Sequence, residues 1–397
     1  MNLIARGAGR GRSALVCLLG SLAVAISGCG GGGGDNATPA PVVKQSSFVE
    51  GPITGFGSII VGGVRFDDSA ARIDDDDDRP RRTDDLQLGM MVEIEAGAID
   101  RAAGRADATR IRFGAEIVGP VESVDTGASK LIVFGQTVQV RETTVFDDSL
   151  AGGLTAIAVG DVLEVHAQFN AASGVYVATR IDSENDADLF RLRGLVTDLD
   201  TSAKTFRIGT ALISYASAES ALRRPLAEGE RLRVRTQTTQ VDGAWVAVQL
   251  REGDRRPDNH DEAEVHGLVT QFDSRDSFVV DGMRIDASGV ADVPAGVAVG
   301  AEVEVEGAIV DGVLVARKVE LEDSENDRER FEIHGAIDKL DVDGNTLVVR
   351  GITVAFDRLD ALECRGAALA NGHPVEVRGA LSTDGTRLAA TRIHCED

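Results

Sequence analysis

The residues with the most definite chemistry in this chain are two Glu-x-His pairs. Glu264 and His266 form one pair, Glu332 and His334 form the other, and each pair stands just before a glycine at the equivalent point of an internal repeat. Residues two apart on a strand share a face, so each pair could offer a carboxylate and an imidazole to one metal ion. Two protein ligands make only a weak site. We therefore expect exposed cross-strand pairing at both positions and assign no metal or other cofactor.

A run of five aspartates, Asp74 to Asp78, is followed directly by Arg79, Arg81 and Arg82. Calcium loops interleave their carboxylates with turn residues and glycine. A continuous run lacks that layout and repels itself. We expect a solvated loop that is neutralised by its own arginines, with weak cation binding as the alternative.

The sequence gives no pattern for catalysis. Nucleophilic catalysis needs a serine or cysteine on a tight strand-to-helix turn with a histidine base, and no such elbow is present. No glycine-rich phosphate loop precedes a predicted helix. Paired carboxylates are uninformative in a chain with 65 Asp and Glu residues. We therefore predict that the protein is not an enzyme and has no catalytic residues.

Residues 1–28 have the layout of a secretory signal peptide, with early arginines, an apolar run from Ala14 to Ile26 and small residues before Cys29. The apolar run is too short for a membrane span. The segment Ile26–Cys29 resembles the lipobox of bacterial lipoproteins. That resemblance implies that Cys29 is acylated and becomes the mature N-terminus. Because Gly30, and not an aspartate, follows the cysteine, it also implies retention at the outer membrane.

Residues 29–47 are rich in glycine and proline, which predicts a flexible tether after the lipid. The formal net charge of the chain is -24. A chain this acidic is repelled by nucleic acid and by anionic lipid. Aromatic residues make up only 4% of the sequence, which disfavours stacking platforms for bases or sugar rings.

Four cysteines are present, and two of them have roles near the N-terminus: Cys17 is removed with the signal peptide and Cys29 is the lipid site. In an oxidising envelope compartment, the remaining Cys364 and Cys395 are expected to form one disulfide within the last repeat. Metal binding by these two thiolates beside His394 is the alternative.

The remainder of the chain repeats itself about every 70 residues. In the fourth copy, Asp281-Gly282 and Asp311-Gly312 predict hairpin turns, and Glu302 to Glu306 alternates acid with valine. Five strands joined in this way predict a small closed barrel of the OB type. The predicted fold class is all-β: five tandem small OB-like barrels, as beads on a string, over residues 48–114, 115–186, 187–253, 261–323 and 330–397.

Each copy opens on a glycine, the second has Val159-Gly-Asp161 in its middle, and its ending Ala178-Thr-Arg-Ile181 recurs in other copies. These motifs resemble the bacterial family called domain of unknown function 5666, which occurs in tandem in lipoproteins. The resemblance covers nearly everything from Phe48 to Asp397. The third copy departs most, because it ends on Ala247-Val-Gln-Leu250. The resemblance implies a fold and an address but supplies no catalytic residues.

Together these observations favour a non-enzymatic envelope lipoprotein that acts as a binding or spacer scaffold. We expect it to be anchored by lipid to the bacterial outer membrane, periplasmic or surface-exposed, with envelope proteins as partners and no nucleic acid. The alternative is a glycan- or cation-binding module whose small ligand the sequence does not identify.

Overall fold

The computed structural model describes residues 45–253, 256–322, 330–364, 369–382 and 384–396. The predicted signal peptide, Cys29 and the tether as far as residue 44 lie outside these ranges. Inside them the regular secondary structure is almost entirely β-strand, and no helix there has the length and hydropathy of a membrane span. The short 3-10 helices are η1 (Thr83–Asp85), η2 (Asp148–Leu150) and η3 (Gly153–Ala156).

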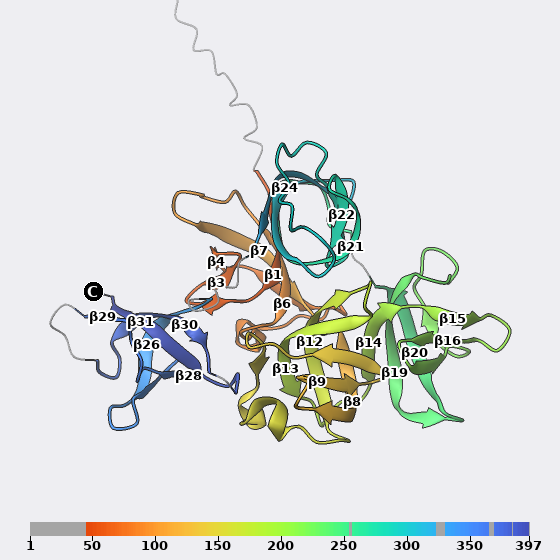
Figure 1. Cartoon of the computed structure of the whole chain (residues 1–397), viewed down its shortest axis with the longest axis horizontal. Helices are drawn as coiled ribbons and strands as arrows, with labels where there is room; N and C mark the ends of the chain where they lie inside the picture. Colours follow the sequence, from red (N-terminus) through yellow and green to blue (C-terminus); the bar gives the residue numbers. More distant parts are fainter. Residues whose placement is uncertain (1–44, 254–255, 323–329, 365–368, 383, 397) are drawn as a thin grey trace, which may run out of the picture. The chain divides into compact units, whose positions relative to one another are not determined.

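The fourth repeat shows how the sequence makes a barrel, and Figure 1 shows it almost end on, with β21, β22 and β24 around its circumference. Its strands pair in the closed order β21–β22–β23–β25–β24–β21, in which β23 and β25 run parallel. This Greek-key order closes a five-stranded barrel of the OB type. Asp281 and Gly282 form the β22–β23 turn with the positive φ angles, 45° and 96°, that a tight hairpin requires. The strands are β21 (His260–Ser274), β22 (Ser277–Val280), β23 (Met283–Asp286), β24 (Glu302–Val310) and β25 (Val313–Leu321).

The second and fifth repeats close in the same order, each with its third and last strands in parallel. The second repeat contains β8 (Ile117–Asp125), β9 (Lys130–Val133), β10 (Gln136–Gln139), β11 (Val145–Phe146), β12 (Val162–Asn170) and β13 (Val175–Ser183). The fifth contains β26 (Phe331–Asp341), β27 (Thr346–Val349), β28 (Ile352–Ala355), β29 (Ala361–Glu363), β30 (Pro374–Leu381) and β31 (Leu388–Cys395).

The first and third repeats differ only in that the opening strand of the barrel is split in two. The five closed barrels predicted from the sequence are thereby confirmed. The first repeat contains β1 (Ser47–Pro52), β2 (Gly55–Phe56), β3 (Ile59–Val61), β4 (Val64–Asp67), β5 (Arg72–Asp75), β6 (Met91–Ala96) and β7 (Arg105–Phe113). The third contains β14 (Phe190–Leu195), β15 (Thr197–Asp200), β16 (Thr205–Ile208), β17 (Ala211–Ser214), β18 (Glu219–Ser220), β19 (Arg231–Val241) and β20 (Ala244–Glu252).

Alternation of side chains along each strand fills the barrel interiors. On β24, Val303 and Val305 are fully buried, whereas the alternating Glu302, Glu304 and Glu306 are only partly buried. Period-two alternation places successive side chains on opposite faces of a strand, so one face enters the core. The valines that the sequence placed inside the fourth barrel are therefore core residues.

Strand pairing also joins one repeat to another within residues 44–397, which form one compact unit. The first strand of the fourth barrel, β21, runs parallel to β1, and the first strand of the fifth, β26, runs parallel to β2. The second and third barrels meet through β8 and β14, which are antiparallel. A string of separate beads, as predicted from the sequence, would not have these pairings. The pairings bring residues of different repeats into shared sites.

The two cysteines of the fifth barrel are joined in a disulfide. Cys364 follows β29 and Cys395 ends β31, with their Cα atoms 4.8 Å apart. The bond therefore ties the final strand to its neighbour within one barrel.

Candidate metal centre

The first Glu-x-His pair lies on β21, where that strand pairs with β1 of the first repeat. Glu264 is 2% exposed and His266 is 6% exposed. The expectation of an exposed pair is therefore wrong. Its physical reason is that β1, from a repeat about 200 residues earlier in the sequence, covers this edge of the fourth barrel.

His266 makes two short contacts with carboxylates. Its Nε2 lies 2.7 Å from Oε1 of Glu264, and its Nδ1 lies 2.7 Å from Oε1 of Glu322. Glu304 on β24 stands directly opposite His266 in the strand register. Potential ligand atoms of Glu264, His266 and Glu304 all lie within 4.8 Å of one another. Two of these ligands are close neighbours in the sequence, and the fold supplies the third.

The electrostatics of this cluster favour a bound positive charge. Burial alone lowers the pKa of His266, but its hydrogen bonds to Glu264 and Glu322 outweigh burial and raise that pKa to about 10. Burial, together with the charges of Glu264 and Glu306, raises the pKa of Glu304 to about 7. The imidazole is therefore a cation held between two acids, and the third acid keeps its proton at a higher pH than an exposed glutamate does.

A glycine packs directly against the imidazole. Gly62 forms the β3–β4 turn of the first repeat with a positive φ of 59°. A Cβ atom at this position would lie 2.0 Å from Nε2 of His266 and 2.7 Å from Oε1 of Glu264. Any side chain at this position would therefore collide with the two ligand atoms, and only glycine allows the turn to lie this close to them.

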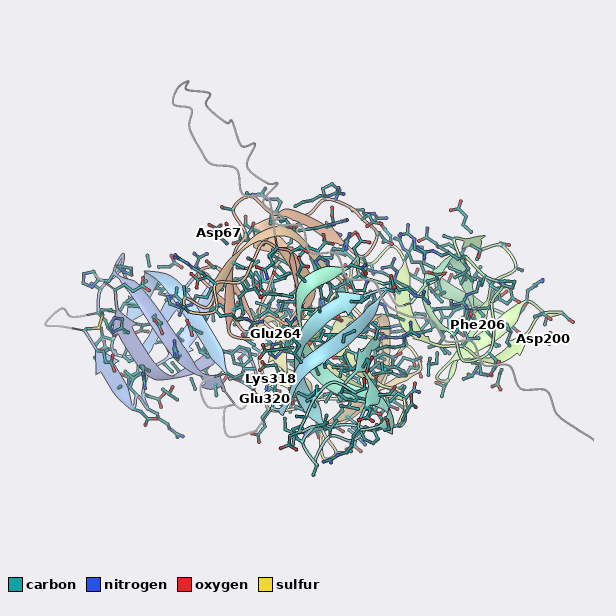
Figure 2. The ribbon with its side chains drawn as sticks, turned by 90° about the horizontal axis from the view of Figure 1, so that it is seen from above. Asp67, Asp200, Phe206, Glu264, Lys318 and Glu320 are labelled. Atoms are coloured by element: carbon teal, nitrogen blue, oxygen red, sulfur yellow. A yellow bond between two sulfur atoms is a disulfide. The ribbon has the colours of Figure 1, made fainter. Side chains whose placement is uncertain are left out.

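Two basic side chains border the cluster without filling it. Arg101 of the first repeat contacts Oε2 of Glu264 at 2.9 Å, which leaves Oε1 directed to His266. Lys318 lies 2.8 Å from Glu306 but 3.9 Å from Glu304. Figure 2 labels Glu264 and Lys318 on the fourth barrel. Arg101 and Lys318 thus bind carboxylate oxygens that do not face His266.

The second pair, Glu332 and His334 on β26, forms a similar cluster with Glu376. His334 Nε2 lies 2.5 Å from Glu332, and Nδ1 lies 2.9 Å from Glu396. Hydrogen bonding to Glu332 raises the pKa of His334. The geometry of one imidazole between two acids is thus repeated in the fifth barrel.

Arginines occupy the second cluster, and the strand register gives the reason. Glu306 stands opposite Glu264 on β24, whereas Arg378 stands opposite Glu332 on β30. Arg378 binds Glu376 at 2.7 Å and Glu332 at 3.0 Å. Arg65 of the first repeat contacts Glu332 and lies 3.2 Å from Nε2 of His334. Two guanidinium groups thus contact the ligand residues of the second cluster directly, which makes the cluster of the fourth repeat the better candidate for a metal ion.

The pKa of Glu332 reflects that neutralisation. Burial alone raises it, but the hydrogen bonds from His334 and Arg65 and the charge of Arg378 lower it to about 2. In the cluster of the fourth repeat, by contrast, the pKa of Glu304 is raised. The two clusters therefore differ in how much of their negative charge is compensated.

A cavity of about 420 Å³ reaches both clusters. His266, Glu304 and Glu322 line it from the fourth repeat, and Glu332 and Arg378 line it from the fifth. Gly62 also lies on its wall. A hydrated ion could therefore approach the His266 cluster through this space.

Sequence reasoning missed Glu304 and Glu322. The alternation of Glu304 with valines on β24 indicated only an acid that faces water, and Glu322, which follows β25, belonged to no recognised pattern. The strand register brings both acids to His266. The only feature of the sequence that could have indicated this register is the shared opening of each repeat. Glu304 and its counterpart Glu376 stand at the same point of the two repeats, so comparison of the copies could have marked them.

The aspartate run is also placed differently from the expectation. Asp74, Asp75 and Asp76 are all at least 92% buried. Asp76 binds Arg193 at 2.5 Å and Arg233 at 3.1 Å, both in the third repeat. The prediction of a solvated loop is wrong because arginines from another repeat, as well as its own, compensate the acids and allow burial.

Comparison with known proteins identifies the repeat. Three segments, residues 118–182, 266–320 and 334–394, match the family described as Domain of unknown function (DUF5666). The chain therefore carries repeated copies of this domain, and the predicted family is confirmed in the second, fourth and fifth repeats. No curated protein matches the chain.

Among solved structures, the chain is similar to one described as drosophila Unr CSD456. The two are 12% identical, and the match covers 52% of this chain and 96% of the other, with a TM-score of 0.14. The OB-type assignment therefore rests on the strand order of the barrels themselves.

Proposed function

We propose that this protein is a non-enzymatic binding scaffold that holds one divalent cation at the junction of its first and fourth repeats. The observation that carries the proposal is the convergence of Glu264, His266 and Glu304 beside the bare turn at Gly62. Three protein ligands with a free side suit a cation that keeps water or a partner's ligand in its remaining positions.

The donor set favours a transition metal over calcium. One imidazole nitrogen and two carboxylate oxygens suit zinc or manganese, whereas calcium takes six to eight oxygen ligands. Glu322 supports this assignment, because a histidine that binds metal through one nitrogen usually donates its other N–H to a carboxylate. Glu322 Oε1 already lies 2.7 Å from Nδ1. Zinc is therefore the first cation to test.

Isothermal titration of the full chain in detergent micelles with zinc chloride, repeated with manganese and calcium, tests the proposal. We expect one zinc ion per chain and a release of protons, because the metal displaces the proton on Nε2. Glu304→Gln should weaken zinc at least about tenfold, since it removes a charged ligand. The matched variant Glu376→Gln, at the same point of the fifth repeat, should bind zinc like the wild type.

Two results count against this function. The first is no heat of binding with zinc or manganese. The second is an equal loss of zinc affinity in Glu304→Gln and Glu376→Gln. That result would indicate a general electrostatic effect and not a metal site built from specific ligands.

We further propose that the scaffold works in the bacterial envelope. The support is the segment Ile26–Cys29 and the tether after it. Barrel faces and exposed strand edges offer surfaces for envelope proteins, since backbone groups on an unpaired edge can accept another strand. Crosslinking in intact cells tests this part: reproducible capture of one envelope protein supports it, and diffuse labelling opposes it.

A further inference from the structure

A second cavity, of about 610 Å³, lies on the fourth barrel against the third. Val279 of β22 and Met283 and Arg284 of β23 line one side. Leu222 and Arg224, from the loop before β19, line the other. In OB-type barrels, the surface over the second and third strands is the one that takes ligands. This cavity, which we call the arginine cleft, occupies that surface of the fourth barrel.

The arginine cleft has the opposite charge to the rest of the chain. Five arginines and two glutamates are among its lining residues, although the whole chain has a formal net charge of -24. A concave site that concentrates one sign of charge raises the local concentration of ligands of the other sign. The ligand of this cleft is therefore expected to be an anion.

Two of the five arginines are committed to neighbouring groups. Arg231 binds Glu116 at 2.7 Å and lies over the ring of Phe169. Arg223 lies 3.7 Å from Glu252. The other three, Arg224, Arg256 and Arg284, are exposed and form no ion pair within the part of the chain that the structure describes.

The three unpaired arginines come from separate elements. Arg284 is on β23, opposite Val279 in the strand register. Arg256 precedes β21, and its aliphatic stem would lie 3.6 Å from a Cβ at Gly312 in the β24–β25 turn. Arg224 belongs to the third repeat. Three guanidinium groups from three elements can surround an anion from different directions, whereas groups from one strand cannot.

We propose that the arginine cleft binds a small organic anion that carries a phosphate or a carboxylate. Guanidinium groups recognise both anions through paired hydrogen bonds. Leu195, Leu222 and Val279 add apolar lining for the uncharged part, and the volume lies in the range of small-molecule sites. A nucleic acid fits poorly, because Phe169 is 8% exposed and already lies under Arg231.

Titration of the full chain with three monosaccharides tests this proposal. Glucose 6-phosphate carries a phosphate, glucuronate carries a carboxylate, and glucose carries neither. We expect one or both anions to bind with one site per chain, and glucose to bind much more weakly or not at all. The anion that binds more tightly identifies the natural charge of the ligand.

Charge reversal locates the site. Arg284→Glu and Arg224→Glu should each weaken the anion about tenfold or more, because each removes a charged hydrogen-bond donor. Arg275→Glu is the matched control, since Arg275 is an exposed arginine of the β21–β22 turn in the same barrel and does not line the cleft. Circular dichroism of each variant verifies that the barrels are folded.

Several outcomes would overturn the proposal: binding of neither anion, equal binding of glucose, or an equal effect of Arg275→Glu. The metal variant Glu304→Gln should leave anion affinity unchanged. A loss of anion binding in that variant would place the anion at the metal centre and would also overturn the proposal.

Discussion

Gly62 is the residue at which the account of the metal centre can be tested most simply. Gly62→Ala should abolish cation binding, because its Cβ would lie 2.0 Å from Nε2 of His266. Gly63→Ala is a matched control: Gly63 also has a positive φ, 74°, but a Cβ there meets no atom within 4 Å. Both changes strain the turn by roughly 1 kcal/mol or more. Zinc titration should separate them, and equal zinc affinity in the two variants contradicts the role of Gly62.

Glu50 is a second single residue with a testable effect: it should make the stability of the protein depend on pH. Burial, together with the charges of Glu93 and Asp281, raises the pKa of Glu50 well above its ordinary value of 4.5. A raised folded-state pKa means that its stabilising contribution is present below that ordinary value and is lost as pH rises through the folded-state pKa. Glu50→Gln should therefore be more stable than the wild type at pH 8 and lose that advantage at pH 4. Urea unfolding at both pH values measures the difference, and a pH-independent difference contradicts the prediction.

At the scale of elements, the aspartate run acts as a connector between the first and third repeats. Asp76→Asn should destabilise the protein by about 3 kcal/mol, because it leaves Arg193 and Arg233 short of a buried partner. Asp84→Asn is the control, since the Arg82–Asp84 pair is 81% exposed on both sides and should contribute little. Urea unfolding compares the two variants. Similar stability of Asp76→Asn and the wild type would show that the run is held by other contacts.

The strands also show which parts of the fold could be predicted from the sequence. The barrels were predictable because Asp281-Gly282 marks a hairpin and Val303 and Val305 mark an inward face, and both signals are local. The pairing of β1 with β21 was not predictable, because any unpaired barrel edge has the same alternation of residues. The same limit explains the sites: Glu264 and His266 were found as neighbours on one strand, but their burial depends on a distant repeat.

At the scale of the whole molecule, the lipid anchor is the main prediction that lies outside the described residues. Cys29→Ala should remove acylation and release the protein from the membrane fraction, since several acyl chains together make anchoring stable. Labelling of cells with radioactive palmitate, followed by fractionation, measures both effects. Persistence of the variant in the membrane fraction would mean that another part of the chain holds it there.

The central claim is that Glu264, His266 and Glu304 of the fourth repeat bind one divalent cation where that repeat meets the first. X-ray absorption at the zinc edge of the zinc-loaded full chain tests it most directly. We expect one imidazole nitrogen and oxygen ligands at about 2.0–2.2 Å, without sulfur, and loss of the imidazole signal in the variant Gly62→Ala but not in Gly63→Ala. A zinc spectrum without imidazole, or one that is unchanged in Gly62→Ala, would contradict the claim.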